Sequence, residues 1–267
     1  MKIIISHDVD HITSCEHFKD LFLIKYLTRN ILELYKKSIS FRQFYRRLLL
    51  IFKNKFNNIQ DLLTFDAANS VFPTYFIAVN NALSLSYNKK YAKKIASTLV
   101  KKGICIGLHG INFETLQGII DERDLFQKLT GVNPKGVRMH YLRENEETHK
   151  YLEQAGYVFD STQSTYINPF KVGTLWEFPV HLMDSTLIYG NSRIQIKPLK
   201  QIQYETIQAI ENAEILNIEY FTLVTHDFYF SDSHKLWKDW YIWLINYLKD
   251  RSYVFISFEN AILECEK

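Results

Sequence analysis

The chain has 267 residues, of which 47% are hydrophobic and 15% aromatic, enough for one large buried core. A formal net charge of +3 is too small to favour nucleic-acid binding, and no glycine-rich phosphate loop or aromatic RNA-binding motif is present. The three cysteines form no paired motif and indicate reduced thiols. No apolar run approaches the roughly 18 residues of a membrane span, and the few residues before Asp8 are too short for a secretory signal. We therefore expect a cytoplasmic protein.

Short apolar runs alternate with helix-like segments along the chain, which is typical of a parallel sheet or a (β/α) barrel. Several of the predicted strands end in a polar residue: Asp8, His109, Asp160 and His226. Because barrels place their sites at the carboxyl ends of their strands, we expect these residues to lie together. The predicted strands are Lys2–Asp8, Thr74–Val79, Ile104–His109, Gly136–Met139, Tyr157–Asp160, Leu175–Val180, Phe221–His226 and Tyr253–Ser257.

The first strand runs directly into a pair of acids, Asp8 and Asp10. Residues two apart on a strand point the same way, so the two carboxylates project together. Such a pair repels unless a cation lies between the carboxylates, or one is a base and the other a metal ligand. A helix cap is the alternative, but a cap needs only one of the two acids. The opposite parity turns His7 toward the surrounding helices, as a core histidine.

Residues 12–62, between the first two strands, are predicted to form a basic helical insertion. From Lys25 to Lys55, nine lysines and arginines stand against Glu33 alone, a local charge of +8. Apolar residues at spacings of three and four indicate an amphipathic helix. We expect it near the mouth of the barrel. It would either contact an anionic membrane or a phosphorylated substrate, or form a solvated lid packed by its aromatic face; the cations expected to face an anionic partner include Arg42, Arg46 and Arg47.

Near the C-terminus, bulky residues recur at helical spacing. Such a stripe is more often core than a sugar-binding platform, and its members are Trp237, Trp240, Tyr241, Trp243, Leu244, Tyr247 and Leu248. No internal repeat or low-complexity linker interrupts the sequence. We therefore expect a single domain over residues 1–267 that carries the insertion.

Collected in chain order, the strand-end groups match the parts needed for metal-assisted hydrolysis of an amide or ester. This chemistry uses a carboxylate base, a metal that polarises the carbonyl and acidifies water, and a late acid that protonates the leaving group. The sequence offers Asp8 and Asp10, His109, Arg138 with His140 and Tyr141, Asp160, and His226 with Asp227.

At these residues the chain resembles the polysaccharide deacetylase family, carbohydrate esterase family four. The resemblance covers nearly the whole chain and implies a distorted (β/α)7 barrel. Phe72-Pro73-Thr74-Tyr75-Phe76 is similar to the second strand of the family. The five family motifs appear in order, as Ser6-His7-Asp8-Val9-Asp10, Gly107-Leu108-His109-Gly110, Arg138-Met139-His140-Tyr141, Phe159-Asp160-Ser161-Thr162 and Leu223-Val224-Thr225-His226.

The resemblance also implies roles for individual residues. Asp8 would be the catalytic base, while Asp10 and His109 would bind a divalent metal, usually zinc. Arg138 would pair with the base and keep it ionised, because a nearby arginine lowers the pKa of a carboxyl group. The backbone N–H of Tyr141 would help to stabilise the oxyanion. His226 would be the general acid.

Two departures from the family pattern bear on the site. The second motif usually supplies another histidine four residues after the first, but Phe113 stands there. Asn112 could lean the same way, and His140 shares the strand face of Arg138, so either could be the third metal ligand. In the fourth motif, Gln163 replaces a second acid that would tune His226. Asp227 could take that part, although its strand parity is opposite to that of His226.

The sequence thus predicts a metal-dependent hydrolase that removes an N-acetyl or similar acyl group from an amino sugar during assembly of a cell-surface polysaccharide. A cytoplasmic location favours a nucleotide-linked or lipid-linked substrate, with peripheral membrane contact through residues 25–55 and no nucleic-acid partner. One alternative is a catalytically weak carbohydrate-binding or scaffold protein on the same fold. Another is a deformylase or a non-sugar amidohydrolase.

Overall fold

The computed structural model describes residues 1–18, 20–86, 88–190 and 195–267. Its centre is one sheet with the strand order β6-β7-β5-β4-β3-β2-β1-β9-β8, in which β10 also pairs with β1. Every pairing is parallel except that of β6 with β7. The strands are β1 (Lys2–Val9), β2 (Thr74–Ile77), β3 (Cys105–Gly110), β4 (Gly136–Met139), β5 (Phe159–Asp160), β6 (Phe170–Val172), β7 (Leu175–Glu177), β8 (Val180–Met183), β9 (Tyr220–His226) and β10 (Val254–Ile256).

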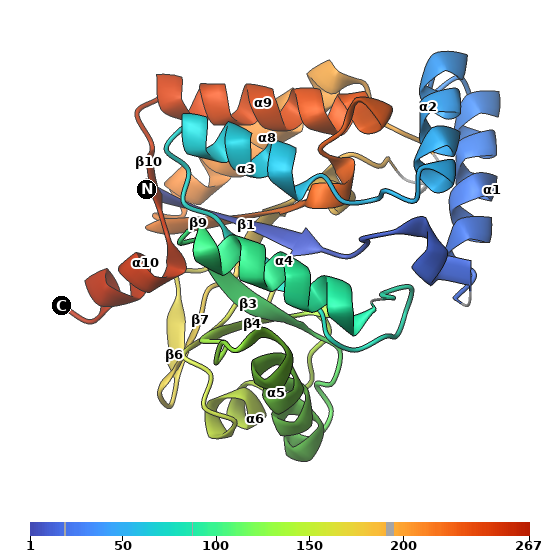
Figure 1. The fold of residues 1–267 in the computed structure, drawn as a ribbon. Helices are drawn as coiled ribbons and strands as arrows, with labels where there is room; N and C mark the ends of the chain where they lie inside the picture. Colours follow the sequence, from blue (N-terminus) through green and yellow to red (C-terminus); the bar gives the residue numbers. More distant parts are fainter. Residues whose placement is uncertain (19, 87, 191–194) are drawn as a thin grey trace.

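Helices surround this sheet (Figure 1). The α-helices are α1 (Phe22–Tyr35), α2 (Phe41–Phe52), α3 (Ile59–Ala68), α4 (Lys89–Lys101), α5 (Leu116–Thr130), α6 (Thr148–Gln154), α7 (Asp184–Leu187), α8 (Leu199–Ile215), α9 (Lys235–Asp250) and α10 (Phe258–Cys265). Short 3₁₀ turns are η1 (Ser14–Phe18), η2 (His140–Leu142), η3 (Asp227–Tyr229) and η4 (Asp232–His234). None of the described helices has the length and apolarity needed to span a bilayer.

Alternate residues of the strands supply two hydrophobic clusters, one on each face of the sheet. The inner cluster joins Ile4, Phe76 and Phe159 with Phe258 of α10. Ile3 and its neighbours of the same parity belong to a larger hydrophobic cluster on the outer face, against the helices. The parity predicted for the first strand is therefore right: Asp8 shares the inner face with Ile4. His7 is buried on the outer face, between Thr225 and Asp66 of α3, at 2.6 and 2.9 Å.

Two glycines make room for the rings of the inner cluster. A Cβ atom at Gly107 would lie 2.6 Å from a ring carbon of Phe76, and one at Gly136 would lie 2.0 Å from the Phe159 ring. Larger residues would therefore displace these rings. Each glycine lies two residues before a candidate site residue, His109 or Arg138, on the same face of its strand.

One predicted strand, Leu175–Val180, is wrong. The chain breaks at Phe178-Pro179, and the two halves, β7 and β8, pair with β5 and β9 at opposite ends of the sheet order. Proline lacks a backbone N–H and restricts the residue before it, so it ends the first half. Phe178 is buried in the inner cluster at this break.

Between β1 and β2, the helices α1 and α2 stand side by side beyond the carboxyl end of β1, and α3 runs back along the sheet (Figure 1). Arg47 of α2 is buried there. Its guanidinium donates to the Ser233 carbonyl at 3.1 Å, to Asn30 at 2.7 Å and to Glu33 at 2.5 Å. The expectation that Arg47 faces an anionic partner is therefore wrong, because Glu33 and the chain after β9 already hold its charge.

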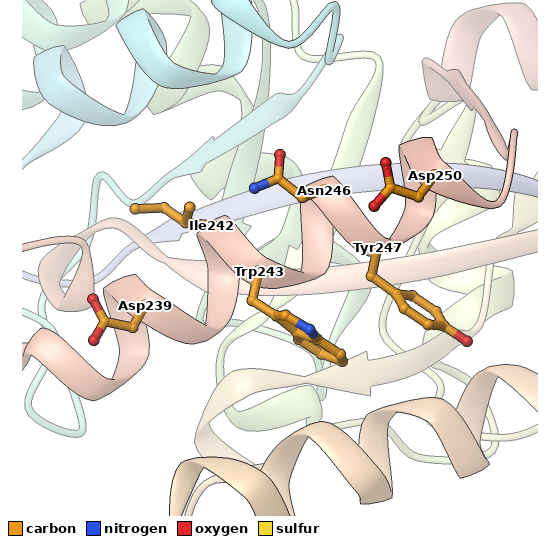
Figure 2. A pocket seen from close by; sticks show the side chains of 6 residues that line it. All are labelled: Asp239, Ile242, Trp243, Asn246, Tyr247 and Asp250. Atoms are coloured by element: carbon orange, nitrogen blue, oxygen red, sulfur yellow. The ribbon is translucent and has the colours of Figure 1, made fainter.

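Most of the C-terminal aromatic stripe is core, as predicted. Trp237, Trp240 and Tyr241 are buried on α9. Trp243 and Tyr247 are only partly buried; their stacked rings, 5.3 Å apart, line a surface pocket of about 390 Å³ along α9 (Figure 2). None of the candidate site residues lines this pocket.

Candidate active site and metal cluster

The carboxyl ends of four strands bring the predicted site residues together. Asp8 pairs in register with His226 across β1 and β9, and His109 pairs with Arg138 across β3 and β4. Asp10 lies just after β1, and contacts join these strand ends to one another. The candidate base, metal ligands and acid therefore share one site.

The candidate base is held by a buried arginine. Arg138 Nη1 donates to Asp8 Oδ1 at 2.8 Å, and both side chains are almost fully buried. Arg138 is itself fixed by Ser161, whose carbonyl and hydroxyl oxygens accept from Nε at 2.8 Å and from Nη2 at 2.9 Å. Burial alone would raise the pKa of Asp8, but the charges of Arg138, His109 and His226 together outweigh burial and hold that pKa below its usual value. Asp8 is therefore a carboxylate at neutral pH.

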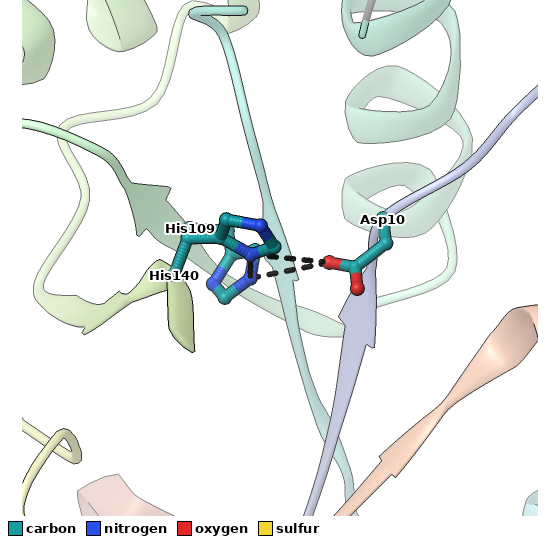
Figure 3. Close-up of side chains that lie close together, drawn as sticks. All are labelled: Asp10, His109 and His140. Carbon is teal, nitrogen blue, oxygen red and sulfur yellow. Dashed lines mark hydrogen bonds and ion pairs between the residues drawn. The ribbon is translucent and has the colours of Figure 1, made fainter. Parts of the chain in front are cut away.

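Three metal-binding side chains converge beside Asp8: Asp10, His109 and His140 (Figure 3). Asp10 Oδ1 lies 3.2 Å from His109 Nε2 and 3.7 Å from His140 Nδ1, and the two ring nitrogens are 3.1 Å apart. Of the two residues that the sequence offers as a third ligand, His140 is the one whose ring lies beside Asp10 and His109. Asn112, the other candidate, has its backbone N–H bound to Glu122.

The neighbouring carbonyl groups fix the tautomers of both histidines. His109 Nδ1 lies 3.0 Å from the Arg138 carbonyl oxygen, and His140 Nε2 lies 3.3 Å from that of Leu83. A carbonyl only accepts, so these two nitrogens carry hydrogen. When neutral, each ring then turns its lone pair toward Asp10, an arrangement typical of histidine metal ligands.

The cluster fits a divalent metal. Asp10 Oδ1 is buried and accepts no hydrogen bond, although two imidazoles surround it. Burial lowers the pKa of His140 to about 4, so that ring is neutral at neutral pH. Burial would lower the pKa of His109, but Asp8 and Asp10 outweigh burial and raise it. A carboxylate oxygen and two imidazole nitrogens that share one buried space therefore suit a cation, which is a proton on His109 or a metal ion. Two imidazoles and one carboxylate are a common donor set for catalytic zinc.

The candidate acid, His226, has a partner that the sequence analysis missed. His226 Nδ1 lies 2.7 Å from Asp184 Oδ1, and the other carboxylate oxygen of Asp184 accepts from the His226 backbone N–H at 2.9 Å. His226 Nε2 lies 3.6 Å from Asp10 Oδ2. Burial alone would lower the pKa of His226, but Asp184 and then Asp10 outweigh it and raise the pKa to about 10. His226 is therefore protonated at neutral pH, as a general acid must be.

Asp184, rather than Asp227, thus takes the part of the acid that is missing at Gln163. Asp227 instead accepts from the backbone N–H of Asn58 at 2.9 Å. The sequence did carry a signal: Asp184 directly follows β8, so it is another acid at the end of a strand. The signal was lost because the predicted strand stopped at Val180.

Two further residues complete the description. Tyr141 adopts left-handed backbone angles (φ 60°) in η2, and its exposed side chain donates to the Leu83 carbonyl at 3.2 Å.

The expectation that Asp160 joins the other strand-end groups is wrong. Its register partner on β4 is Val137, which belongs to the hydrophobic cluster on the outer face, so Asp160 points away from Asp8 and toward His149 of α6.

The curled parallel sheet and the strand-end cluster together define a class: the chain has the fold of the polysaccharide deacetylases, with acid, base and metal-type ligands at the carboxyl ends of the strands. No family model matches the sequence, and no curated protein sequence matches it. Solved structures do match.

A protein from Mycobacterium smegmatis assigned as a polysaccharide deacetylase has a TM-score of 0.66 and 16% identity, over 98% of this chain and 88% of that one. One of the same assignment from Pseudomonas aeruginosa PAO1 has a TM-score of 0.60 and 13% identity, over 98% and 88%. A variant of a pseudoenzyme of carbohydrate esterase family four, with restored enzymatic activity, has a TM-score of 0.51 and 10% identity, over 97% and 66%. The predicted fold is confirmed.

Proposed function

We propose that the protein is a metal-dependent hydrolase that removes an N-acetyl or similar acyl group from an amino sugar. The proposal rests on one observation: an ionised carboxylate and a protonated imidazole both lie close to Asp10. The ionised Asp8, held by Arg138, lies two residues before Asp10 on the same strand end, and the protonated His226, its neighbour on β9, reaches Asp10 at 3.6 Å. A base and an acid beside a cluster of metal-binding side chains are what amide hydrolysis requires.

Each residue has a place in the reaction. Asp8 takes a proton from water while the water oxygen bonds to the acyl carbon. The backbone N–H of Tyr141 donates to the oxygen of the tetrahedral intermediate. The C–N bond then breaks, and His226 gives its proton to the leaving nitrogen, so that acetate and a free amino sugar result. Arg138 holds Asp8 in place and ionised.

A divalent metal, which we propose to be zinc, would be held by Asp10, His109 and His140; when bound, it supplies polarisation of the carbonyl and acidification of water. The same fold is used by a pseudoenzyme, so a catalytically weak scaffold is the second candidate. The pairing of Asp8 with Arg138 and of His226 with Asp184 supports the enzyme instead, because a scaffold has no need of an ionised base beside a protonated acid.

An assay of acyl release tests the proposal. The zinc-loaded protein is incubated with N-acetylglucosamine oligosaccharides, with nucleotide-linked N-acetylhexosamines and with lipid-linked ones, and acetate is measured. We expect release from at least one class, its loss on chelation, and its recovery on addition of zinc. Release of formate from N-formyl sugars alone would indicate a deformylase. Sugar binding without release of any acid by the loaded protein would contradict the proposal and indicate a scaffold.

The insertion supports a location at the inner face of an anionic membrane, and hence a lipid-linked substrate. Ile24, Ile31 and Tyr35 lie along one face of α1, and Phe41 and Phe52 along one face of α2; each is more than half exposed. Exposed cations flank them: Lys25, Lys36, Lys37, Arg42, Lys53 and Lys55. A lid packed by its aromatic face would bury these rings. Exposed apolar residues bordered by cations favour an interfacial surface instead.

A further inference from the structure

A second group of side chains that could bind a metal lies on the outer face of the sheet. Asp160 at the end of β5 and Glu177 at the end of β7 are register partners on neighbouring strands. His149 of α6 lies over them: its Nε2 atom is 3.6 Å from Asp160 Oδ2 and 3.5 Å from Glu177 Oε2. Glu144 reaches the same nitrogen at 3.6 Å. We call His149, Asp160 and Glu177 the outer cluster.

In each carboxylate of the outer cluster, one oxygen accepts hydrogen bonds from the residues after β5 and the other has no hydrogen bond. Asp160 Oδ1 accepts from the Ser161 N–H at 2.8 Å and from the Thr162 hydroxyl at 2.6 Å, and Glu177 Oε1 accepts from the Gln163 N–H at 2.9 Å. Asp160 Oδ2, Glu177 Oε2 and His149 Nε2 are buried without a hydrogen bond, and both acids have no exposed surface. Native proteins rarely leave three such atoms facing one space.

All three ligand atoms lie within 4.8 Å of one another, and the two distances from His149 match those around a tetrahedral ion. Ligand atoms about 2.0–2.2 Å from a tetrahedral zinc lie about 3.3–3.6 Å from one another, and His149 Nε2 lies 3.5 and 3.6 Å from the two carboxylate oxygens. The charges favour a dication too, because the two buried carboxylates supply two negative charges and Glu144 lies at the edge of the cluster. Without a cation, burial and the mutual repulsion of the two acids raise the pKa of Asp160 well above its usual value, and burial raises that of Glu177 to about 7.

The outer cluster is also linked to the candidate base. Asp160 holds the Ser161-Thr162 turn, and Ser161 holds Arg138, which is the partner of Asp8. A group that holds Asp160 in place therefore also holds Ser161, which positions the Arg138 side chain. The same side chains join α6 to the sheet.

We propose that His149, Asp160 and Glu177 form a second divalent-cation site, of the zinc class, that clamps α6 onto β5 and β7 and steadies the turn behind Arg138. It is a structural site, separate from the cluster at Asp10. The rival explanation is a proton shared between the two carboxyl groups, with no metal.

Zinc stoichiometry distinguishes the two explanations. The full-length protein is stripped with a chelator, equilibrated with zinc in the presence of a weak competing chelator, and assayed for bound metal per chain. We expect two ions in the wild type, one in His149→Ala, one in Asp10→Asn and none in the double variant. His149→Ala removes a ligand but no hydrogen bond seen in the structure, so we expect it to fold; Lys150→Ala, on the exposed side of α6, is the matched control and should keep two.

A second variant and a second measurement guard against misfolding. Glu177→Gln keeps the oxygen that accepts from Gln163, and it too should bind one ion. In the Asp10→Asn background, zinc should raise the melting temperature, and the added His149→Ala change should abolish that rise. If folded Asp10→Asn bound no zinc and showed no thermal shift, the two acids would share a proton and the outer site would be refuted, whether or not the protein is a deacetylase.

Discussion

The two clusters on this sheet use the same types of side chain for different ends. The cluster of Asp10, His109 and His140 lies at the carboxyl ends of the strands, beside an ionised Asp8 and a protonated His226. The outer cluster lies beneath α6, where we find no comparable pair of acid and base among the described residues. Metal-type ligands alone therefore do not mark an active site, and the groups around them decide what a bound ion can do.

The clusters also differ in charge. One carboxylate and two imidazoles leave a dication with net positive charge, which suits polarisation of a substrate carbonyl. Two buried carboxylates and one imidazole, with Glu144 at their edge, offset the whole charge of a dication, which leaves a bound ion less able to polarise a carbonyl. The predictions below test this contrast, beginning with the largest effect.

Replacing the base should separate catalysis from metal binding. We expect Asp8→Asn to reduce kcat by at least the roughly 10²–10⁴-fold typical of a lost acid or base, with the bound zinc unchanged. Glu177→Gln should show the reverse: one zinc fewer, and a much smaller loss of rate. Acetate release and metal analysis on the same samples measure both. A fully active Asp8→Asn variant would overturn the mechanism.

Removing one inner ligand should weaken metal binding at that cluster alone. Loss of an outer-shell partner of a metal ligand typically costs about 10–100-fold in affinity, and His140→Ala removes a ligand itself, so we expect at least that loss. Competition with a chromophoric chelator measures the two affinities separately. If His140→Ala bound zinc as tightly as the wild type at both clusters, Asn112 or water would be the third ligand.

The insertion should bind anionic vesicles through charge and exposed apolar surface. Each cation near such a surface contributes about 1 kcal/mol, so Arg42→Gln with Arg46→Gln should weaken binding by roughly 30-fold at low salt and by less at high salt. Lys93→Gln with Lys94→Gln, the same change of charge on α4, is the matched control. Vesicle sedimentation gives the result; equal binding by both double variants would leave a solvated lid.

Asp184 should set the alkaline limit of activity. The carboxylate of Asp184 helps to raise the pKa of His226 to about 10, and an opposite charge at such range shifts a pKa by about 1–3 units. In Asp184→Asn the pKa of His226 should fall, so the acid form is lost earlier and the alkaline limb of kcat/KM moves to lower pH. An unmoved limb would mean that another group supplies the proton.

The sequence was sufficient for much of this picture, because strand-end polarity and strand parity are local properties. Asp8, Asp10, His109, Arg138 and His226 could be placed together from their motifs. His140 was found because it shares the parity of Arg138. By contrast, the insertion's Arg47 could not be recognised as buried, since its partner Ser233 lies far along the chain.

The misses have a common cause. Asp184 was missed because the predicted strand ran across Pro179 and stopped at Val180, where β8 in fact begins. Asp160 was expected beside Asp8 because only its position at a strand end was considered, and β5 has only two residues, too few to show parity. The outer cluster depends on the pairing of β5 with β7 and on the position of α6. Such contacts between distant segments are set by tertiary packing, which no local pattern records.

The most direct test of the account is the position of bound zinc in crystals of the protein. Anomalous scattering at the zinc edge should give a peak between Asp10, His109 and His140, with the Asp8 carboxylate beside it and still paired to Arg138. A fully loaded crystal with no peak at these three residues, or with Asp8 turned away from the ion, would contradict the central claim that this cluster and this base form the active site.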